Sequence, residues 1–442
     1  MNGADTAFVL ISAALVMLMT PGLAFFYGGM VRVKSTLNML MMSFISLAIV
    51  SVLWVLYGYS LTFGDDIGGG LLGNLDHIGL KGITANSEVG LDGHHIPVFA
   101  FAAFQLMFAI ITPALISGAL ADRVKFGAWS LFVVLWATVV YFPVAHWVWG
   151  PEGWIGLNGD KVKAIDFAGG TAVHINAGIA ALAVVLVIGK RVGFKKDPMR
   201  PHSLPLVMLG AGLLWFGWFG FNAGSELAAD GTAAAMALNT QVATAAAVIG
   251  WLVYEKLRHG TITMLGGASG AVAGLVAITP SGASVNAMGA LAIGVVAGFV
   301  CAWAVGLKYK LGYDDSLDVV GVHLVGGIIG TLLVGVFGIQ GGAGAAKSLT
   351  DGGSIEQLGR QAAGAGAVLV YTFVVTWILA KAIDMTIGFR VSEDDEVSGI
   401  DQTEHSESAY DFSGVGSAAA RTTLGNPGSD APAQGQAKKV DA

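Results

Sequence analysis

Eleven long, continuous apolar runs constrain this chain more than any other feature of its sequence. They cover residues 7–31, 36–63, 97–121, 126–149, 168–189, 204–223, 233–255, 262–278, 287–307, 319–339 and 364–388. A transmembrane helix needs about 20 mostly apolar residues, whereas the strands of a membrane barrel are short and alternate. Only 12% of the residues are charged, against about 25% in a soluble domain. We therefore expect an all-α polytopic membrane protein with eleven transmembrane helices.

Glycine and cysteine usage narrow the class further. The chain has 64 Gly residues, and in lipid glycine lets helices approach one another closely. A single cysteine, Cys301, excludes a disulfide framework and a CxxC redox or zinc motif. No Lys or Arg precedes Arg32, so the first apolar run lacks the basic start of a secretory signal, and we expect it to remain as a span.

Lys and Arg between the spans predict the orientation, because cytoplasmic loops carry the excess of basic residues. With the N-terminus outside, the inner loops hold Arg32, Lys34, Arg123, Lys125, Lys190, Arg191, Lys195, Lys196, Arg200, Lys256, Arg258, Lys308 and Lys310. The outer loops then hold Lys81, Lys161, Lys163, Lys347 and Arg360. We expect a multi-pass protein of the cytoplasmic membrane with its N-terminus outside and its C-terminus in the cytoplasm.

The C-terminal region differs in composition from the spans. Residues 392–411 are acidic and polar, and residues 413–442 are rich in Gly, Ala, Ser and Pro. The second segment cannot bury enough apolar surface to order itself. We therefore expect a transmembrane unit over residues 1–390, a cytoplasmic regulatory tail over 391–412 and a disordered extension over 413–442.

Two histidines are the most informative polar residues inside the spans. His174 and His323 each lie in mid-span, and ionisable groups at membrane depth usually face a cavity, a relay or a partner. Asp166 precedes His174 by eight residues and Asp318 precedes His323 by five, which is a weak echo between two halves of five spans each. Inverted halves with the site between them are a common transporter plan. The alternative is that each ring is simply hydrogen bonded to a neighbouring helix.

Two neutral imidazoles in contact could share a proton and line an apolar pore with polar groups. A metal site competes with this interpretation, but zinc uses three or four protein ligands and the spans contain no HxxxH motif and no paired Cys. We expect neither a metal nor another cofactor. Asp166 precedes a Gly-rich span, where it can cap free backbone N–H groups and also support a nearby cation.

Aromatic clusters stand near the predicted outer ends of three spans. FQLMF ends at Phe108, HWVWG contains Trp149, and LLWFGWFGFNAGS ends at Ser225. Each ring taken alone is an ordinary interfacial residue. Together, ring faces can hold a small cation, at about 0.5–2 kcal/mol for each ring. Rings with a hydroxyl and no acidic residue inside the spans suit a weakly hydrated, ammonium-like ion better than sodium.

The strings that carry these residues resemble the ammonium transporter family (Amt/Mep/Rh), in its bacterial Amt branch. They are PGLAFFYGGMVR from Pro21, FAIITPALISGALADRVKF from Phe108, YFPVAHWVWG from Tyr141, DFAGGTAVHINAG from Asp166, GWFGFNAGS from Gly217, DVVGVHLVGG from Asp318 and FRVSEDDEVSGIDQTEHSESAY from Phe389. The resemblance covers about residues 5–412.

The resemblance implies two inverted five-helix repeats plus one C-terminal helix, with a pore within each subunit of a homotrimer. It assigns the outer ammonium site to Phe108, Trp149 and Ser225, with Phe104 as a further vestibule aromatic. It matches the rings that close the pore to Phe108 and Phe221, the pore histidines to His174 and His323, and the supporting carboxylate to Asp166. It also implies that a PII-type signalling protein reads the tail. We expect membrane lipid, but no nucleic acid, among the other partners.

The expected function is ammonium uptake, and not enzymatic catalysis. Ammonium would bind at the outer site, lose its proton there and cross the apolar pore as ammonia, with the proton either left outside or transferred separately. A second class is an ammonium sensor that signals through an appended domain, for which this tail is too short and too simple in composition. A membrane hydrolase is a third class, but no nucleophile or metal set accompanies the two histidines.

Overall fold

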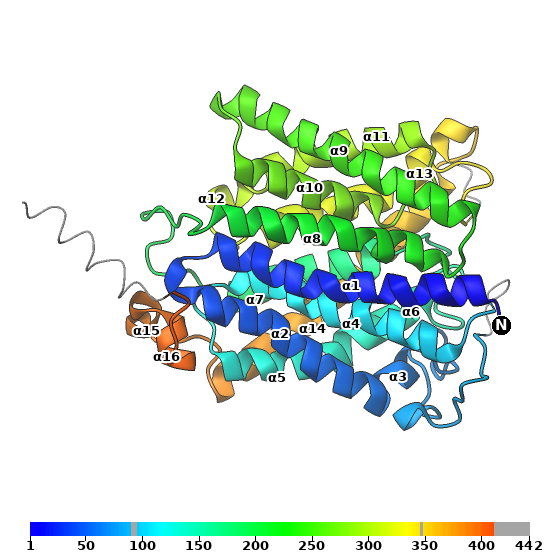
Figure 1. Cartoon of the computed structure of the whole chain (residues 1–442), viewed down its shortest axis with the longest axis horizontal. Coiled ribbons are helices and arrows are strands. Elements are labelled where there is room, and N and C mark those ends of the chain that lie inside the picture. Colours follow the sequence, from blue (N-terminus) through cyan, green and yellow to red (C-terminus); the bar gives the residue numbers. More distant parts are fainter. Residues whose placement is uncertain (90–94, 345–347, 411–442) are drawn as a thin grey trace, which may run out of the picture.

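Helices make up the regular structure of this protein. The computed structural model describes residues 1–89, 95–344 and 348–410, and in these residues it has isolated bridges but no strand. Figure 1 shows the long helices side by side, with the N-terminus at one end of the bundle and the two short helices α15 and α16 at the other. We call these two ends the N-terminal face and the tail face.

The elements fall into two groups of five spans, followed by one long helix and the tail. The first group contains α1 (Gly3–Met30), η1 (Val33–Ser35), α2 (Thr36–Leu53), η2 (Trp54–Gly58), α3 (Tyr59–Phe63), η3 (Ile78–Leu80), α4 (Val98–Leu120), α5 (Phe126–Trp136), η4 (Ala137–Tyr141), α6 (Phe142–Trp149), η5 (Gly170–Ile175) and α7 (Asn176–Ile188). The second contains α8 (Leu204–Ala223), η6 (Gly224–Glu226), α9 (Gly231–His259), α10 (Met264–Ile278), α11 (Ala287–Ala304), α12 (Leu307–Leu311), η7 (Val320–Leu324), α13 (Val325–Phe337) and η8 (Leu349–Asp351). The last elements are α14 (Glu356–Thr386), α15 (Glu393–Ser398) and α16 (Ile400–His405).

The predicted spans are confirmed as helices. Within the described residues, ten helical segments are long and apolar enough to cross a membrane, and α10 is an eleventh, shorter apolar helix. Four spans contain a π-helical turn: η2 between α2 and α3, η4 between α5 and α6, η5 before α7, and η7 before α13. The chain is therefore an all-α polytopic membrane protein.

The last span begins earlier than its hydropathy predicts. The apolar run starts at residue 364, whereas α14 starts at Glu356. Its first turns carry Gln361, which is fully buried: its amide oxygen accepts from Ile165 N at 2.6 Å, and its amide nitrogen donates to Ile165 O at 2.7 Å. These polar turns are helical because they satisfy the backbone of the loop that leads to η5.

The two groups of spans are inverted relative to one another. Helices α1 and α8 pack antiparallel, since Ser203 N, at the start of α8, donates to Gly29 O at the end of α1. Their close contact depends on glycine residues, which have no side chain. A Cβ at Gly210 would lie 2.2 Å from Phe26 N, and one at Gly22 would lie 3.0 Å from Leu213 Cβ. Small residues at such crossings let helix backbones approach closely in lipid.

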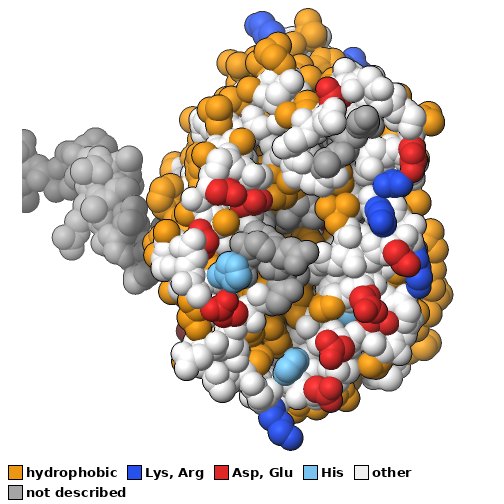
Figure 2. Space-filling model, turned by 90° about the vertical axis from the view of Figure 1, so that its right-hand side faces the viewer, with side chains coloured by type: hydrophobic (Ala, Val, Ile, Leu, Met, Phe, Trp, Pro, Cys, Tyr) orange, Lys and Arg blue, Asp and Glu red, His pale blue; other side chains and the backbone are white. Residues whose placement is uncertain are grey.

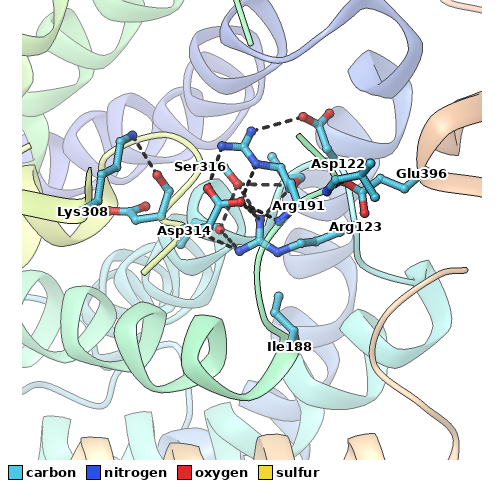
Figure 3. Close-up of polar contacts among 12 residues, drawn as sticks. Asp122, Arg123, Ile188, Arg191, Lys308, Asp314, Ser316 and Glu396 are labelled. Carbon is cyan, nitrogen blue, oxygen red and sulfur yellow. Dashed lines mark hydrogen bonds and ion pairs between the residues drawn. The ribbon is translucent and has the colours of Figure 1, made fainter. Parts of the chain in front are cut away.

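Ion pairs tie the loops together at the tail face (Figure 3). Asp314 receives hydrogen bonds from the Arg191 guanidinium at 2.8 and 3.0 Å, and the buried Arg123 donates to Asp314 O at 2.6 Å. Asp122 pairs with Arg191 at 3.3 Å and with Arg32 at 3.1 Å. Burial alone would raise the pKa of Asp314, but the hydrogen bonds and charge of Arg191, with the charge of Arg123, hold it below its usual range.

The tail docks on this face through three carboxylates. Asp401 accepts from Leu37 N at 2.9 Å and from Asn38 N at 2.8 Å, in the first turn of α2. Glu404 accepts from Phe126 N at 2.8 Å, the first residue of α5. Glu396 accepts from Val192 N at 2.7 Å and pairs with Arg390 at 2.6 Å. The segment expected as a regulatory tail is thus folded against the spans as far as it is described. Residues 411–412 and the expected extension 413–442 lie outside the described residues.

Candidate functional site

An aromatic cavity of about 260 Å³ lies at the N-terminal face. Phe108 of α4, Trp149 at the end of α6 and Ser225 of η6 all line it, so the structure brings together the three residues expected at the outer site. The other lining residues include Phe63, Phe101, Gln105, Asp166, Phe167, Glu226 and Leu227. We call this space the outer cavity. Figure 2 views the molecule onto this face and shows acidic side chains distributed across it.

Hydrogen bonds fix the polar atoms of the outer cavity. The Trp149 indole N–H donates to Asp166 O at 2.9 Å, and its ring lies nearly perpendicular to that of Phe108, with centroids 5.8 Å apart and planes at 84°. The Ser225 hydroxyl donates to Phe221 O at 2.8 Å. A hydroxyl has one donor and two acceptor positions, so the Ser225 oxygen keeps lone pairs for a guest that donates.

Two phenyl rings separate the outer cavity from the interior. Phe108 and Phe221 have centroids 4.2 Å apart and planes at 32°, and both are 1% exposed. The sequence prediction for Phe104 differs from its position. Phe104 is fully buried, meets Phe108 edge-on at 4.9 Å and does not line the outer cavity. Phe101 lines the cavity instead.

His174 and His323 meet beneath these rings. Each lies in a π-helical turn, His174 in η5 and His323 in η7, and their Nδ1 atoms are 3.3 Å apart. The His174 ring stacks on Trp218, with centroids 5.5 Å apart and planes at 20°. π-helical turns inside helices are rare overall, but those that occur are often found at functional sites. The two histidines expected in the halves of the chain are therefore in contact.

The contact between the two Nδ1 atoms requires one ring to donate and the other to accept. A neutral imidazole carries one N–H, so the donating ring has a bare Nε2 and the accepting ring has an Nε2–H. His174 Nε2 is buried and has no hydrogen-bond partner among the described residues. The rings border an apolar space of about 10 Å³ with Leu115, Val173 and Leu214. The pair can thus offer a donor and an acceptor to a small guest.

Asp166 caps the start of the span that carries His174. Its carboxylate accepts from the backbone N–H groups of Gly169 at 2.8 Å, Gly170 at 2.6 Å, Thr171 at 2.8 Å and Ala172 at 3.1 Å, and from the Thr171 hydroxyl. Gly169 has φ 119°, a conformation that favours glycine and wraps the chain around the carboxylate. The capping role expected for Asp166 is therefore seen directly.

Asp315, and not Asp318, is the counterpart of Asp166 in the second half. Asp315 stands eight residues before His323, the same interval as from Asp166 to His174. Its carboxylate accepts from Val319 N at 3.1 Å and Val320 N at 2.7 Å. Asp318 instead pairs with Lys308 at 2.6 Å. Burial, and then repulsion from Asp318, raise the pKa of Asp315 to about 6, although Lys308 lowers it.

Sequence reasoning also missed two buried residues that support the site. Trp218 belongs to a predicted aromatic cluster, but its stacking on His174 depends on the contact between halves. His146 is fully buried, and its ring contacts Thr62 O at 2.8 Å and Asp66 Oδ1 at 3.2 Å. Its position inside an apolar span, in the HWVWG string, is the same kind of signal that points to His174. Within the described ranges, no three His, Cys, Asp and Glu side chains gather as a metal site would require.

Comparisons with known proteins agree on one family. The profile described as "Ammonium Transporter Family" matches residues 7–410. A protein named "Ammonium transporter" from Mycobacterium tuberculosis is 58% identical over 434 residues, which cover 93% of this chain and 91% of the relative. Another of that name from Bacillus subtilis is 45% identical, with 93% and 99% covered. Among solved structures, Saccharomyces cerevisiae Mep2 has a TM-score of 0.79 and 36% identity, with 89% of this chain and 91% of that chain covered.

Asp166→Asn should destabilise the protein. An amide replaces one carboxylate oxygen by an NH₂ group that faces backbone donors, and each N–H left unsatisfied costs about 1–3 kcal/mol. We expect a lower midpoint of thermal unfolding in detergent, measured by intrinsic fluorescence. Asp160→Asn is the control, because Asp160 is exposed in the loop before η5. Equal midpoints for the two variants would contradict a stabilising role for the Asp166 cap.

Proposed function

Because this chain belongs to the ammonium transporter family, we propose that it carries ammonium across the cytoplasmic membrane into the cell. In this proposal the N-terminal face lies outside and the tail face lies in the cytoplasm, as the distribution of Lys and Arg predicts. The observation that carries the proposal is the succession of three features: an aromatic cavity, a closed pair of phenyl rings and two histidines in contact.

Ammonium binds first in the outer cavity. The faces of Phe108 and Trp149 attract the cation through the ring quadrupole, at about 0.5–2 kcal/mol for each ring. The Ser225 oxygen accepts one of the four N–H groups, because its own proton is engaged with Phe221 O. A potassium ion has no N–H to donate, so this hydroxyl geometry favours ammonium.

Ammonium then loses a proton, which either stays with water outside or is transferred separately, and ammonia passes the rings. An isolated ion in a medium as apolar as the space between Phe108, Phe221 and the interior would pay a large desolvation cost, which neutral ammonia avoids. His174 and His323 hydrogen bond the neutral species, one ring as acceptor and the other as donor. A current that accompanies the flux distinguishes separate proton transfer from conduction of ammonia alone.

We also propose that three copies of the chain form a homotrimer and that a PII-type signalling protein binds the tail in the cytoplasm. The family resemblance supports both proposals. The tail offers suitable chemistry, because it presents exposed polar residues while Ile400 and Asp401 are buried against the spans. The chain is also similar to a solved structure named "Sensor Amt Protein", with a TM-score of 0.82 and 28% identity, so an ammonium sensor is the alternative class. Flux separates the two classes, since a sensor need not conduct.

His174→Ala and His323→Ala should each change conduction and selectivity while the protein remains folded. Loss of one ring removes half of the donor–acceptor pair and leaves the other ring without its partner, at about 1–3 kcal/mol of stability. The measurement is flux and current of methylammonium, ammonium and potassium in proteoliposomes. Wild-type flux and selectivity in both variants would remove the histidines from the proposed pathway.

Trp149→Leu and Ser225→Ala should weaken capture of ammonium more than maximal flux. Trp149→Leu removes a ring face, and Ser225→Ala removes an acceptor, so the half-saturating concentration should rise by about two- to thirtyfold for a loss of about 0.5–2 kcal/mol. Uptake measured from micromolar to millimolar ammonium gives the concentration dependence. If both variants kept the wild-type curve, capture would not occur in the outer cavity.

Deletion from Ser392 should impair PII binding or uptake, whereas deletion of Ser413–Ala442 should leave both nearly intact. The longer deletion removes Glu396, Asp401 and Glu404, which bind the backbone at the starts of two spans and after a third. A pull-down with a PII protein, with and without ATP and 2-oxoglutarate, tests binding. Equal binding by the full-length chain and the chain that ends at Val391 would exclude the tail as the docking surface.

A further inference from the structure

The outer cavity is lined by a second carboxyl group besides Asp166. Glu226 follows Ser225 directly and lines the same space as Phe108 and Trp149. Among the described residues that line the cavity, none is Lys, Arg or His. An ammonium ion that enters this cavity therefore meets two acidic side chains and no fixed positive charge.

The two carboxylates are engaged differently. Asp166 is 8% exposed, and its oxygens accept four backbone N–H groups and one hydroxyl, so its charge is largely compensated by donors. Glu226 is only partly buried. Burial, and then the charge and a hydrogen bond of Asp230, raise the pKa of Glu226 to about 7, so its carboxylate is mostly ionised only above that pH. Above about pH 7, the uncompensated negative charge among the residues that line the cavity therefore comes mainly from Glu226. Cavities lined by one sign of charge with low-dielectric walls raise the local concentration of counter-ions.

The backbone around Glu226 is held firmly. The chain leaves α8 through the single turn η6, and Leu227 follows with φ 60° and ψ 8°, an uncommon conformation for a residue with a branched side chain. Ala229 N donates to Asp5 Oδ1 at 2.8 Å, and Asp230 caps α9 by accepting from Ala233 N at 3.0 Å. Because of this turn, Ser225, Glu226 and Leu227 all line the cavity in succession.

We propose that Glu226 is an affinity-determining residue of the outer cavity, whose carboxylate concentrates ammonium beside Trp149 and Ser225. The proposal rests on the proposed function, because it assigns a further role within the same site. Charge and selectivity are divided between different residues. A carboxylate and the ring faces attract any monovalent cation, whereas the Ser225 oxygen can accept an N–H group, which ammonium has and potassium lacks. Loss of Glu226 should therefore weaken capture without changing the preference between cations.

Glu226→Gln tests this division with little change in shape. At about pH 8, above the raised pKa of Glu226, and at low ionic strength, the half-saturating concentration for ammonium and for methylammonium should rise about two- to sixfold, as expected for one charge acting across a partly wet cavity. In about 1 M sodium chloride, where the Debye length is about 3 Å, the variant and the wild type should converge. The ratio of ammonium to potassium flux should stay the same. Glu152→Gln is the matched control, since Glu152 is exposed on the same face and does not line the cavity.

Flux in proteoliposomes is measured alongside calorimetric binding of ammonium chloride to the detergent-solubilised protein, with Trp149→Leu in parallel. A weaker binding constant and a salt-dependent shift in Glu226→Gln, but not in Glu152→Gln, support the proposal. If Trp149→Leu shifts the curves and Glu226→Gln does not, Glu226 has no role in capture, while the proposed function stands. If Glu226→Gln weakens binding in a protein that conducts no ammonium, the proposed function fails and the assignment of Glu226 holds. A shift of the same size in Glu152→Gln would overturn the assignment, because it would reflect the charge of the whole face.

Discussion

The capping of two interrupted helix starts by buried carboxylates is the interaction on which the position of the histidine pair depends. In lipid, every backbone N–H must find an acceptor within the protein. The Asp166 carboxylate accepts hydrogen bonds from four successive N–H groups at η5, and the Asp315 carboxylate accepts from two N–H groups at η7. Each histidine lies eight residues further on, a little over two helical turns. Since the two halves are inverted, equal intervals from opposite ends bring the rings together, at 3.3 Å.

The same requirement explains polar side chains that stand in apolar surroundings. The Gln361 amide hydrogen bonds with both the N–H and the C=O of Ile165. The Thr372 hydroxyl donates to Asn176 Oδ1 at 2.7 Å, which joins α14 to α7. Such groups are fully paired and serve the fold. His174 Nε2 differs from them, because it is buried without a hydrogen-bond partner among the described residues. Because His174 also borders the small apolar space beside His323, this atom can hydrogen bond a guest there.

Hydropathy predicted the architecture well, because a span is determined by apolar length alone. The eleven helices, and the contact of His174 with His323, follow from local runs and from matching positions in the two halves. The errors arose where a contact between distant segments decides the outcome. In the polar start of α14, Gln361 hydrogen bonds with Ile165, and Phe104 is buried in contact with Phe108. The role of Asp315 can be predicted from the sequence, since its interval to His323 equals that of Asp166 to His174. The comparison of the two halves used Asp318 instead, because the family-like string begins there.

The two faces of the molecule use charge in opposite ways. At the N-terminal face, the outer cavity has acidic lining residues and no basic ones among those described. At the tail face, Arg123, Arg191 and Asp314 compensate one another in a buried network. The tail adds Glu396, Asp401 and Glu404, each bound to a backbone N–H at 2.7 to 2.9 Å.

Hydrogen bonds to charged groups contribute about 1.5–3 kcal/mol each, so these three together hold the tail with several kcal/mol. One of these hydrogen bonds is donated by Val192 N. Val192 follows the end, at the tail face, of the span that contains His174. A ligand can shift a conformational equilibrium only by its differential affinity for the two states. A partner that moved the tail would therefore have to replace these contacts with others of comparable strength, or leave the tail in place and bind its exposed side.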